Sequence, residues 1–278
     1  MTTTATTREV DLGEVTLSIA EAGVGGRPLL LVHGFTGAGS DFEHFVEPLA
    51  ERGWHVVAPD QRGHGASSKP ADEAAYDYDT FVGDLLALAD SLGWEGFVLL
   101  GHSMGGMIAQ VLTLDAPERV QALVLMDTGH GSLSVDPDLV GAATSIAREQ
   151  GIDAIADVMG AMGDGPLTSQ AYLRAVEADP SYKERGDRNL RASSPAMFVA
   201  MMLRIGASED RLADLKSVSV PTLVIVGEED EPFRDASQAM ADAIPGAQLA
   251  VVAGGGHSPQ FEAPAAWWDA LSSFLDQV

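Results

Sequence analysis

The stretch "VLLGHSMGGMIAQ", Val98 to Gln110, places a serine between glycines where an apolar run gives way to a helix-like pattern. Glycine inside a strand or helix costs about 0.5–1 kcal/mol relative to alanine, so the local geometry must require it. A nucleophile can stand clear of a sheet on a tight strand-to-helix turn, where flanking glycines relieve the crowding. Gly101-x-Ser103-x-Gly105 fits that context and predicts a nucleophilic serine.

Strand-like and helix-like segments alternate on both sides of this junction. Two alternating segments near the start, "REVDL" and "EVTLSIA", are typical of a hairpin of half-buried strands. Continuous apolar runs typical of strands buried on both faces are "PLLLVHGF" (28–35), "WHVVAPD" (54–60), "FVLLG" (97–101), "VQALVLMD" (120–127), "PTLVIVGEED" (221–230) and "AQLAVVAGGGH" (247–257). This order predicts an α/β fold with a doubly wound, mostly parallel, eight-stranded sheet.

Helical patterns lie between these strands. Residues 77–93 predict a helix that is capped by Asp79 or Thr80 and stopped by Gly93. Two further helices are expected at about residues 234–244 and 265–277.

The segment from residue 128 to residue 219 breaks the alternation, because it holds helical patterns and no convincing strand. The helical patterns there cover residues 138–150, 152–162, 169–178 and 195–206. We expect an α/β core at residues 1–127 and 220–278, interrupted by a helical cap at residues 128–219. The cap is expected to lie over the carboxyl edge of the sheet, where ligands bind in open α/β sheets.

Composition excludes several classes of function. The net charge of 16 − 41 = −25 repels phosphate backbones and anionic headgroups, so we expect no nucleic-acid or membrane partner. The chain has no cysteine, which excludes disulfides, thiolate metal sites and cysteine nucleophiles. The start of the chain lacks a signal-peptide pattern, and no run of 18 apolar residues occurs. We expect a cytoplasmic monomer or homodimer with no metal or cofactor.

The serine needs a base, and seven histidines are available. His257 follows the final strand in the glycine-rich loop "AGGGHSPQ". It is the only histidine that comes after every candidate acid, as the order Ser, Asp or Glu, His requires. His44, His55 and His130 are most simply surface or packing residues. His257 is therefore the predicted base.

The acid that orients the base is expected on a loop after a late strand. A turn starting at Gly227 would bring the third following residue back towards the sheet edge, which favours Asp230. Its rival is Asp127, at the end of "ALVLMD". For the oxyanion, we expect backbone N–H donors at Met104 and Phe35, because one donor follows the nucleophile and the other comes from the loop after an earlier strand.

These blocks resemble the α/β-hydrolase fold superfamily over nearly the whole chain. The matching blocks, in order, are "HGF" (33–35), "PDQRGHGASSKP" (59–70), "GHSMGG" (101–106), "GEED" (227–230) and "GGHSPQFEAP" (255–264). Ser103 argues against haloalkane dehalogenases and epoxide hydrolases, which carry an aspartate nucleophile. The loop "HGFTGAG" lacks the Gly-Pro-Gly typical of meta-cleavage C–C hydrolases. The pattern is similar to carboxylesterases and enol-lactonases with a helical cap.

The resemblance implies a Ser103–His257–Asp230 triad that cleaves a small to medium carboxylic ester or lactone through an acyl-enzyme. A C–C bond hydrolase or lyase-like enzyme on the same triad stays open, as does a hydrolase-like small-molecule receptor. The residues expected to line the substrate pocket are His33, Gly34, His102, Met159, Met197, Phe198 and Met201. The methionines among them suit an adaptable apolar pocket, although methionine at helical spacing is more often plain packing.

Overall fold

The computed structural model describes residues 3–133, 135–163, 165 and 167–278. Within these residues one eight-stranded sheet has the order β1-β2-β4-β3-β5-β6-β7-β8. The strands are β1 (Thr6–Asp11), β2 (Thr16–Ala22), β3 (Arg27–Val32), β4 (Trp54–Pro59), β5 (Phe97–His102), β6 (Val120–Met126), β7 (Thr222–Gly227) and β8 (Gln248–Val252). β2 pairs antiparallel with β1 and β4, and the other pairs are parallel. The predicted doubly wound, mostly parallel fold is confirmed.

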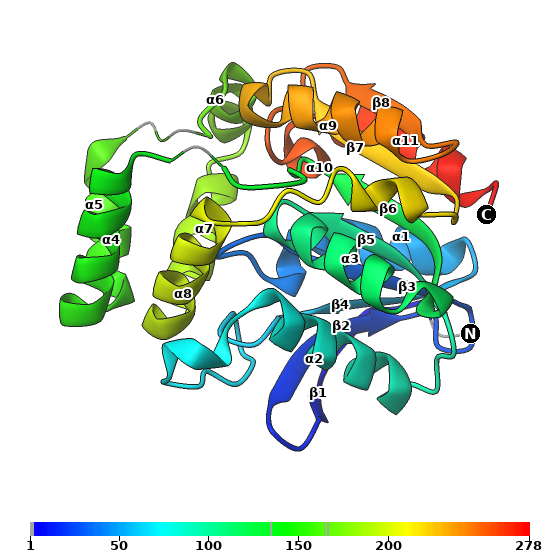
Figure 1. Ribbon diagram of the computed structural model, residues 1–278, viewed down its shortest axis with the longest axis horizontal. Coiled ribbons are helices and arrows are strands. Elements are labelled where there is room, and N and C mark those ends of the chain that lie inside the picture. Colours follow the sequence, from blue (N-terminus) through cyan, green and yellow to red (C-terminus); the bar gives the residue numbers. More distant parts are fainter. Residues whose placement is uncertain (1–2, 134, 164, 166) are drawn as a thin grey trace.

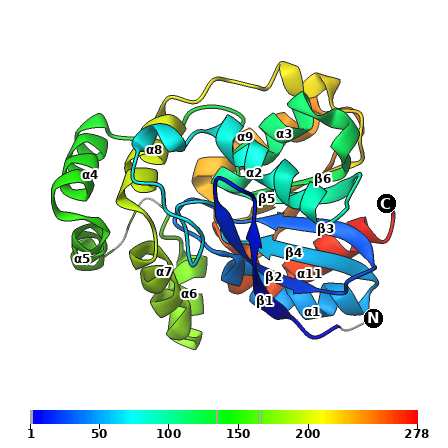
Figure 2. The same ribbon diagram turned by 90° about the horizontal axis from the view of Figure 1, so that it is seen from below.

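Helices cover both faces of the sheet (Figures 1 and 2). One face is covered by α1 (Glu43–Glu51) and α11 (Pro264–Leu275), and the other by α2 (Tyr78–Ser91), α3 (Met104–Asp115) and α9 (Glu231–Ala243). Side chains alternate across a strand, so Leu29 and Leu31 of β3 pack with the first pair of helices. Leu30 and Val32 belong to the opposite apolar cluster. Both faces of β3 are buried, which explains its continuous apolar sequence.

Short helical segments connect these elements. They are η1 (Gly39–Phe42), η2 (Glu73–Ala75), η3 (Pro117–Arg119), η4 (Asp214–Ser217) and α10 (Pro259–Glu262). Among the described residues, no helix is both long and apolar enough to cross a membrane.

Between β6 and β7 the chain forms a group of helices, and we call residues 128–219 the cap. Its helices are α4 (Pro137–Gln150), α5 (Ile152–Met162), α6 (Gln170–Ala178), α7 (Ser181–Arg191) and α8 (Pro195–Gly206). Helices α4, α5, α7 and α8 share a small apolar cluster, which includes Ile155, Leu190 and Phe198. Helices α4 and α5 lie on the outer side, away from the sheet (Figures 1 and 2). Residues 134, 164 and 166 of the predicted cap lie outside the described residues.

The helix α7 is absent from the sequence-based prediction. Its sequence, "SYKERGDRNLR", is strongly polar and carries Gly186 in its middle. Such a segment offers almost no apolar periodicity, and a glycine inside a helix lowers its intrinsic stability. The available signal was Asp179, whose carboxylate accepts a hydrogen bond from the Ser181 N–H (3.0 Å) at the start of the helix.

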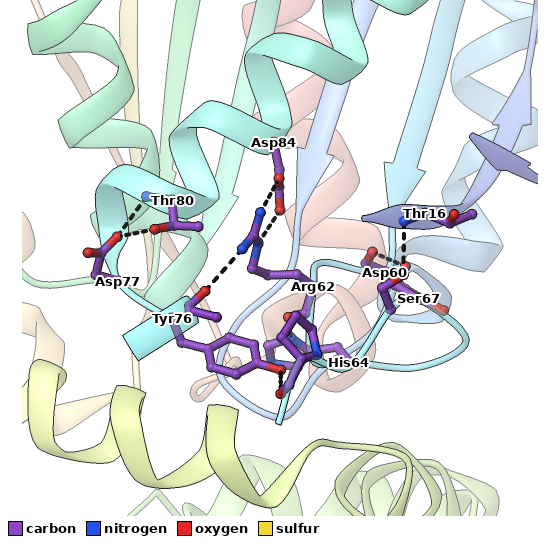
Figure 3. Close-up of polar contacts among 12 residues, drawn as sticks. Thr16, Asp60, Arg62, His64, Ser67, Tyr76, Asp77, Thr80 and Asp84 are labelled. Atoms are coloured by element: carbon purple, nitrogen blue, oxygen red, sulfur yellow. Dashed lines mark hydrogen bonds and ion pairs between the residues drawn. The ribbon is translucent and has the colours of Figure 1, made fainter. Parts of the chain in front are cut away.

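The predicted cap residue of α2 is wrong by two or three positions. The helix spans Tyr78–Ser91, and Asp77, rather than Asp79 or Thr80, is its N-cap. The Asp77 carboxylate accepts hydrogen bonds from the Thr80 N–H (2.7 Å) and from the Thr80 hydroxyl (2.6 Å), as Figure 3 shows. Thr80 is therefore the residue that donates to the cap, at the position that the N-cap side chain normally reaches. Gly93 follows the helix in the left-handed region.

A buried ion pair anchors the loop after β4 to α2 (Figure 3). Arg62 donates from Nε and Nη2 to the two carboxylate oxygens of Asp84, at 2.5 and 2.6 Å. It also donates to the Ala75 carbonyl at 3.1 Å. The Tyr76 hydroxyl closes the loop on the Pro70 carbonyl at 2.6 Å. The bidentate geometry fixes both the loop and the helix, because an arginine fork and a carboxylate match in shape.

We expect Asp84→Asn to lower the free energy of unfolding by about 3–5 kcal/mol, since it leaves the Arg62 charge buried without its counter-charge. Urea unfolding followed by circular dichroism measures this. Asp90→Asn is the matched control. It breaks the Arg119–Asp90 pair (2.7 Å), in which the Asp90 side chain is 68% exposed, and should cost less than about 1 kcal/mol. Equal losses in the two variants would contradict this expectation.

Candidate active site

Ser103 lies on the turn between β5 and α3 with a strained backbone, φ 54° and ψ −118°. The conformation is held by its N–H, which donates to the Met126 carbonyl (2.9 Å), and by its carbonyl, which accepts from the Thr128 hydroxyl (2.6 Å). A Cβ atom at Gly101 would lie 2.2 Å from the Gly105 carbonyl oxygen. The glycines in the quoted stretch are therefore required by close backbone packing around this turn.

The structure brings together the three side chains predicted to form the triad. His257 Nε2 lies 3.0 Å from Ser103 Oγ, and His257 Nδ1 lies 2.9 Å from Asp230 Oδ2. Asp230 is 2% exposed and His257 is 9% exposed. The ring of Phe233 stacks on the His257 imidazole, with centroids 4.8 Å apart. The carboxylate that contacts the imidazole is that of Asp230, while the rival Asp127 accepts a hydrogen bond from the Gly227 N–H (2.8 Å).

The loop after β3 comes close to the nucleophile. A Cβ atom at Gly34 would lie 3.0 Å from the Cβ of Ser103, so only glycine fits there without displacement. The loop turns through Thr36, which has φ 58°. In the described part of the chain, the backbone N–H groups of Phe35 and Met104 have no protein acceptor. Two candidate oxyanion donors are thus left unpaired on the two turns beside Ser103.

His33 and His102 form hydrogen bonds with the backbone of the loops around Ser103. His33 Nδ1 lies 2.8 Å from the Gly34 carbonyl, and its Nε2 accepts from the Gln61 N–H at 3.1 Å. His102 Nε2 lies 2.7 Å from the His257 carbonyl. Burial lowers the pKa of His33, and it lowers the pKa of His102 to about 3, so both rings are neutral near pH 7. Both rings hydrogen-bond to the loop backbone beside Ser103, and the expectation that they also line the substrate pocket stays a prediction.

The predicted pocket residues of the cap fall into different surroundings. Phe198 of α8 packs against Phe35, with ring centroids 5.2 Å apart, and so touches the loop beside Ser103. Met197 and Met201 are fully buried in the main apolar cluster. Met159 is not brought to the site, because its side chain is 54% exposed on the outlying α5 (Figure 1). The spacing of residues along a helix could not distinguish a side chain in the core from one exposed to solvent.

Sequence reasoning assigned no role to Glu262, which lies beside the histidine loop. One of its carboxylate oxygens accepts from the Gly256 N–H, and the other accepts from the Tyr182 hydroxyl at 3.2 Å. Burial raises the pKa of Glu262. Glu262 therefore links the loop that carries His257 to α7 of the cap. Glu262 lies within the motif block at residues 255–264, which could have drawn attention to it. Its partner Tyr182 lies on α7, which the sequence did not predict.

A family profile described as the alpha/beta hydrolase fold matches residues 27–264. The chain belongs to this family. A 2-hydroxymuconate semialdehyde hydrolase of Pseudomonas sp. (strain CF600) is 30% identical over 288 residues, which cover 98% of this hydrolase and 94% of the relative. A non-heme chloroperoxidase of Kitasatospora aureofaciens is 29% identical over 248 residues, covering 84% and 85% of the two chains. A thermophilic esterase of Thermogutta terrifontis superposes with a TM-score of 0.83 at 27% identity, covering 98% and 99%.

We expect Gly105→Ala to destabilise this hydrolase by at least about 1–3 kcal/mol, the usual cost of overpacking. The added Cβ would lie 2.3 Å from the Val32 carbonyl oxygen and 2.5 Å from that of His33, and backbone atoms cannot rotate away. Gly83→Ala, on the exposed face of α2, is the control. Its Cβ meets nothing within 4 Å, so it should gain about 0.5–1 kcal/mol. Urea unfolding would refute the expectation if both variants shifted in the same direction.

Proposed function

We propose that this hydrolase cleaves small to medium carboxylic esters or lactones through an acyl-enzyme on Ser103. The proposal is supported chiefly by the continuous chain of contacts from Ser103 Oγ through His257 to Asp230, next to two unpaired backbone N–H groups. Each member of this arrangement has a necessary part in acyl transfer.

In the first half of the reaction, His257 Nε2 takes the proton of Ser103 as Oγ attacks the carbonyl carbon. The negative charge moves to the carbonyl oxygen, where the N–H groups of Phe35 and Met104 receive it. Asp230 holds Nδ1–H and stabilises the imidazolium. When the tetrahedral intermediate collapses, the ester C–O bond breaks and His257 gives its proton to the departing alkoxide oxygen. A lactone opens in the same step, leaving a hydroxyacyl group on the serine.

In the second half, His257 takes a proton from water and the resulting hydroxide oxygen attacks the acyl carbon. The same N–H groups receive the charge again, and Ser103 leaves with the proton from His257. A single oxyanion donor is typically worth about 2.7–4 kcal/mol of transition-state stabilisation, so these two backbone groups carry a large share of the catalysis. Because they belong to the main chain, substitution at Phe35 or Met104 leaves the donors in place.

We expect Ser103→Ala to lower kcat for p-nitrophenyl butyrate by about 10⁶, as loss of a triad nucleophile can. Rapid mixing of the unchanged protein should release a burst of one p-nitrophenolate per chain when deacylation is slow. Ser217→Ala, at an exposed serine of η4, is the control and should turn over the ester at the original rate. Asp230→Asn should lower kcat by about 10⁴. Unreduced turnover in Ser103→Ala would remove this serine from the mechanism.

C–C bond hydrolysis is the second candidate, and the likeness to 2-hydroxymuconate semialdehyde hydrolase over nearly the whole chain favours it. The loop "HGFTGAG", which lacks the Gly-Pro-Gly typical of meta-cleavage C–C hydrolases, counts against it. We expect hydrolysis of p-nitrophenyl esters and simple lactones and no cleavage of a 2-hydroxy-6-oxo-dienoate. Cleavage of the dienoate is measured as the loss of its visible absorbance. Cleavage of the dienoate that exceeds ester turnover in kcat/KM would reverse this order.

A further inference from the structure

Asp127 occupies an unusual place at the carboxyl end of β6. Its backbone is in the left-handed region, φ 45°, and its N–H donates to the Ile225 carbonyl at 2.9 Å. The side chain is fully buried, and Oδ1 accepts from the Gly227 N–H at 2.8 Å. Among the described residues, no donor reaches Oδ2. Gly227 begins the turn that presents Asp230, and the Asp230 N–H donates to the Gly227 carbonyl at 3.1 Å, so Asp127 is hydrogen-bonded to the start of that turn.

Asp230 lacks the donors that a buried carboxylate normally collects. In the described part of the chain, its carboxylate receives one hydrogen bond, from His257 Nδ1–H at 2.9 Å. Its other close polar neighbour is the carboxyl group of Asp127, which is in hydrogen-bonding contact with it. Two ionised carboxylates in contact inside a protein repel strongly, so one of them keeps a proton.

We propose that Asp127 is a positioning residue that stays protonated at neutral pH and donates its O–H to the carboxylate of Asp230. The inference rests on the proposed function, because it gives this contact a part in orienting His257. Asp230 would then accept one hydrogen bond from the base and one from the neutral acid below it.

The surroundings favour the proton on Asp127 rather than on Asp230. Asp230 contacts the imidazole of His257, and a negative charge on Asp230 stabilises the imidazolium that forms in the reaction. Burial and the charge of Asp230 raise the pKa of Asp127 well above its ordinary value, and the Glu262 carboxylate adds to this. The remaining titratable neighbour of His257 is His102, which is neutral. Among these groups, no cation reaches Asp127 to offset a negative charge on it.

Two substitutions separate the roles of the Asp127 side chain. Asp127→Asn keeps an oxygen for the Gly227 N–H and supplies an amide N–H to Asp230. Asp127→Gly removes both groups. Asparagine and glycine both tolerate the left-handed backbone at this position, so neither adds strain. The pair therefore tests the side-chain contacts of Asp127 apart from its own backbone conformation.

The first experiment measures unfolding by urea for the unchanged protein and Asp127→Asn between pH 5 and pH 7. A protonated Asp127 in the folded state releases its proton on unfolding, because the unfolded pKa is about 3.9. Relative to Asp127→Asn, the folding constant of the unchanged protein should then fall about tenfold per pH unit as the pH rises. Parallel curves would show that Asp127 is ionised when folded and would overturn the proposal. This result does not depend on any enzymatic activity.

The second experiment compares the acid limb of kcat/KM for p-nitrophenyl butyrate. Without its donor, Asp230 concentrates its charge on His257, so Asp127→Gly should move the midpoint up by about one pH unit. The midpoint of Asp127→Asn should stay near that of the unchanged protein. A downward shift in both variants would mean that Asp127 carries a charge, and an unmoved midpoint in Asp127→Gly would leave it a purely structural cap. Either result overturns the positioning role.

The two experiments also separate this inference from the proposed function. If Ser103→Ala retains full ester turnover, the function fails while the unfolding experiment still decides the protonation of Asp127. If Ser103→Ala is inactive and the unfolding curves are parallel, the function stands and the inference fails. If Asp127→Gly does not fold, the acid limb of kcat/KM is measured for Asp127→Ser, whose shorter side chain lacks the amide donor of asparagine.

Discussion

The site depends on strained backbone at the carboxyl edge of the sheet. Among the described residues, the non-glycine positions with positive φ are Thr36, Ser103 and Asp127, and they follow the neighbouring strands β3, β5 and β6. A residue held in such a region costs about 1–3 kcal/mol and persists only where its surroundings fix it. Here the surroundings are the parallel ladder itself, because the Ser103 N–H bonds to the end of β6 and the Asp127 N–H bonds to β7. Hydrogen bonds to neighbouring strands thus offset the strain of the backbone at Ser103 and Asp127.

The same edge controls which groups carry charge. The protein is strongly acidic, and carboxyl groups of Asp127, Asp230 and Glu262 surround the loop of His257. The buried rings of His33 and His102 are kept neutral by desolvation. An imidazolium elsewhere would compete for the Asp230 carboxylate. With the neighbouring histidines neutral, His257, whose ring is hydrogen-bonded to both Ser103 and Asp230, is the candidate for the proton transfers of the proposed function.

Much of the architecture could be predicted because it depends on local patterns. The buried strands are continuous apolar runs, and Ser103, Asp230 and His257 follow a motif order that fixes their places at the sheet edge. The hydrogen bond from the Gly227 N–H to Asp127 could not be predicted in detail, since it requires the pairing of β6 with β7. Met159 could not be separated from Met201 for a similar reason. Helical spacing identifies an amphipathic face, but only tertiary packing shows whether that face meets the core or the solvent.

Two helices of the cap contact the loops of the candidate active site. Tyr182 of α7 binds Glu262, whose second oxygen holds the backbone next to His257. Phe198 of α8 packs on Phe35, whose N–H is an oxyanion donor candidate. A substitution that reshapes the inner surface of α7 or α8 therefore acts on the loops that carry His257 and Phe35. Since packed interiors transmit small displacements, a change in these two helices also displaces the backbone beside His257 and Phe35.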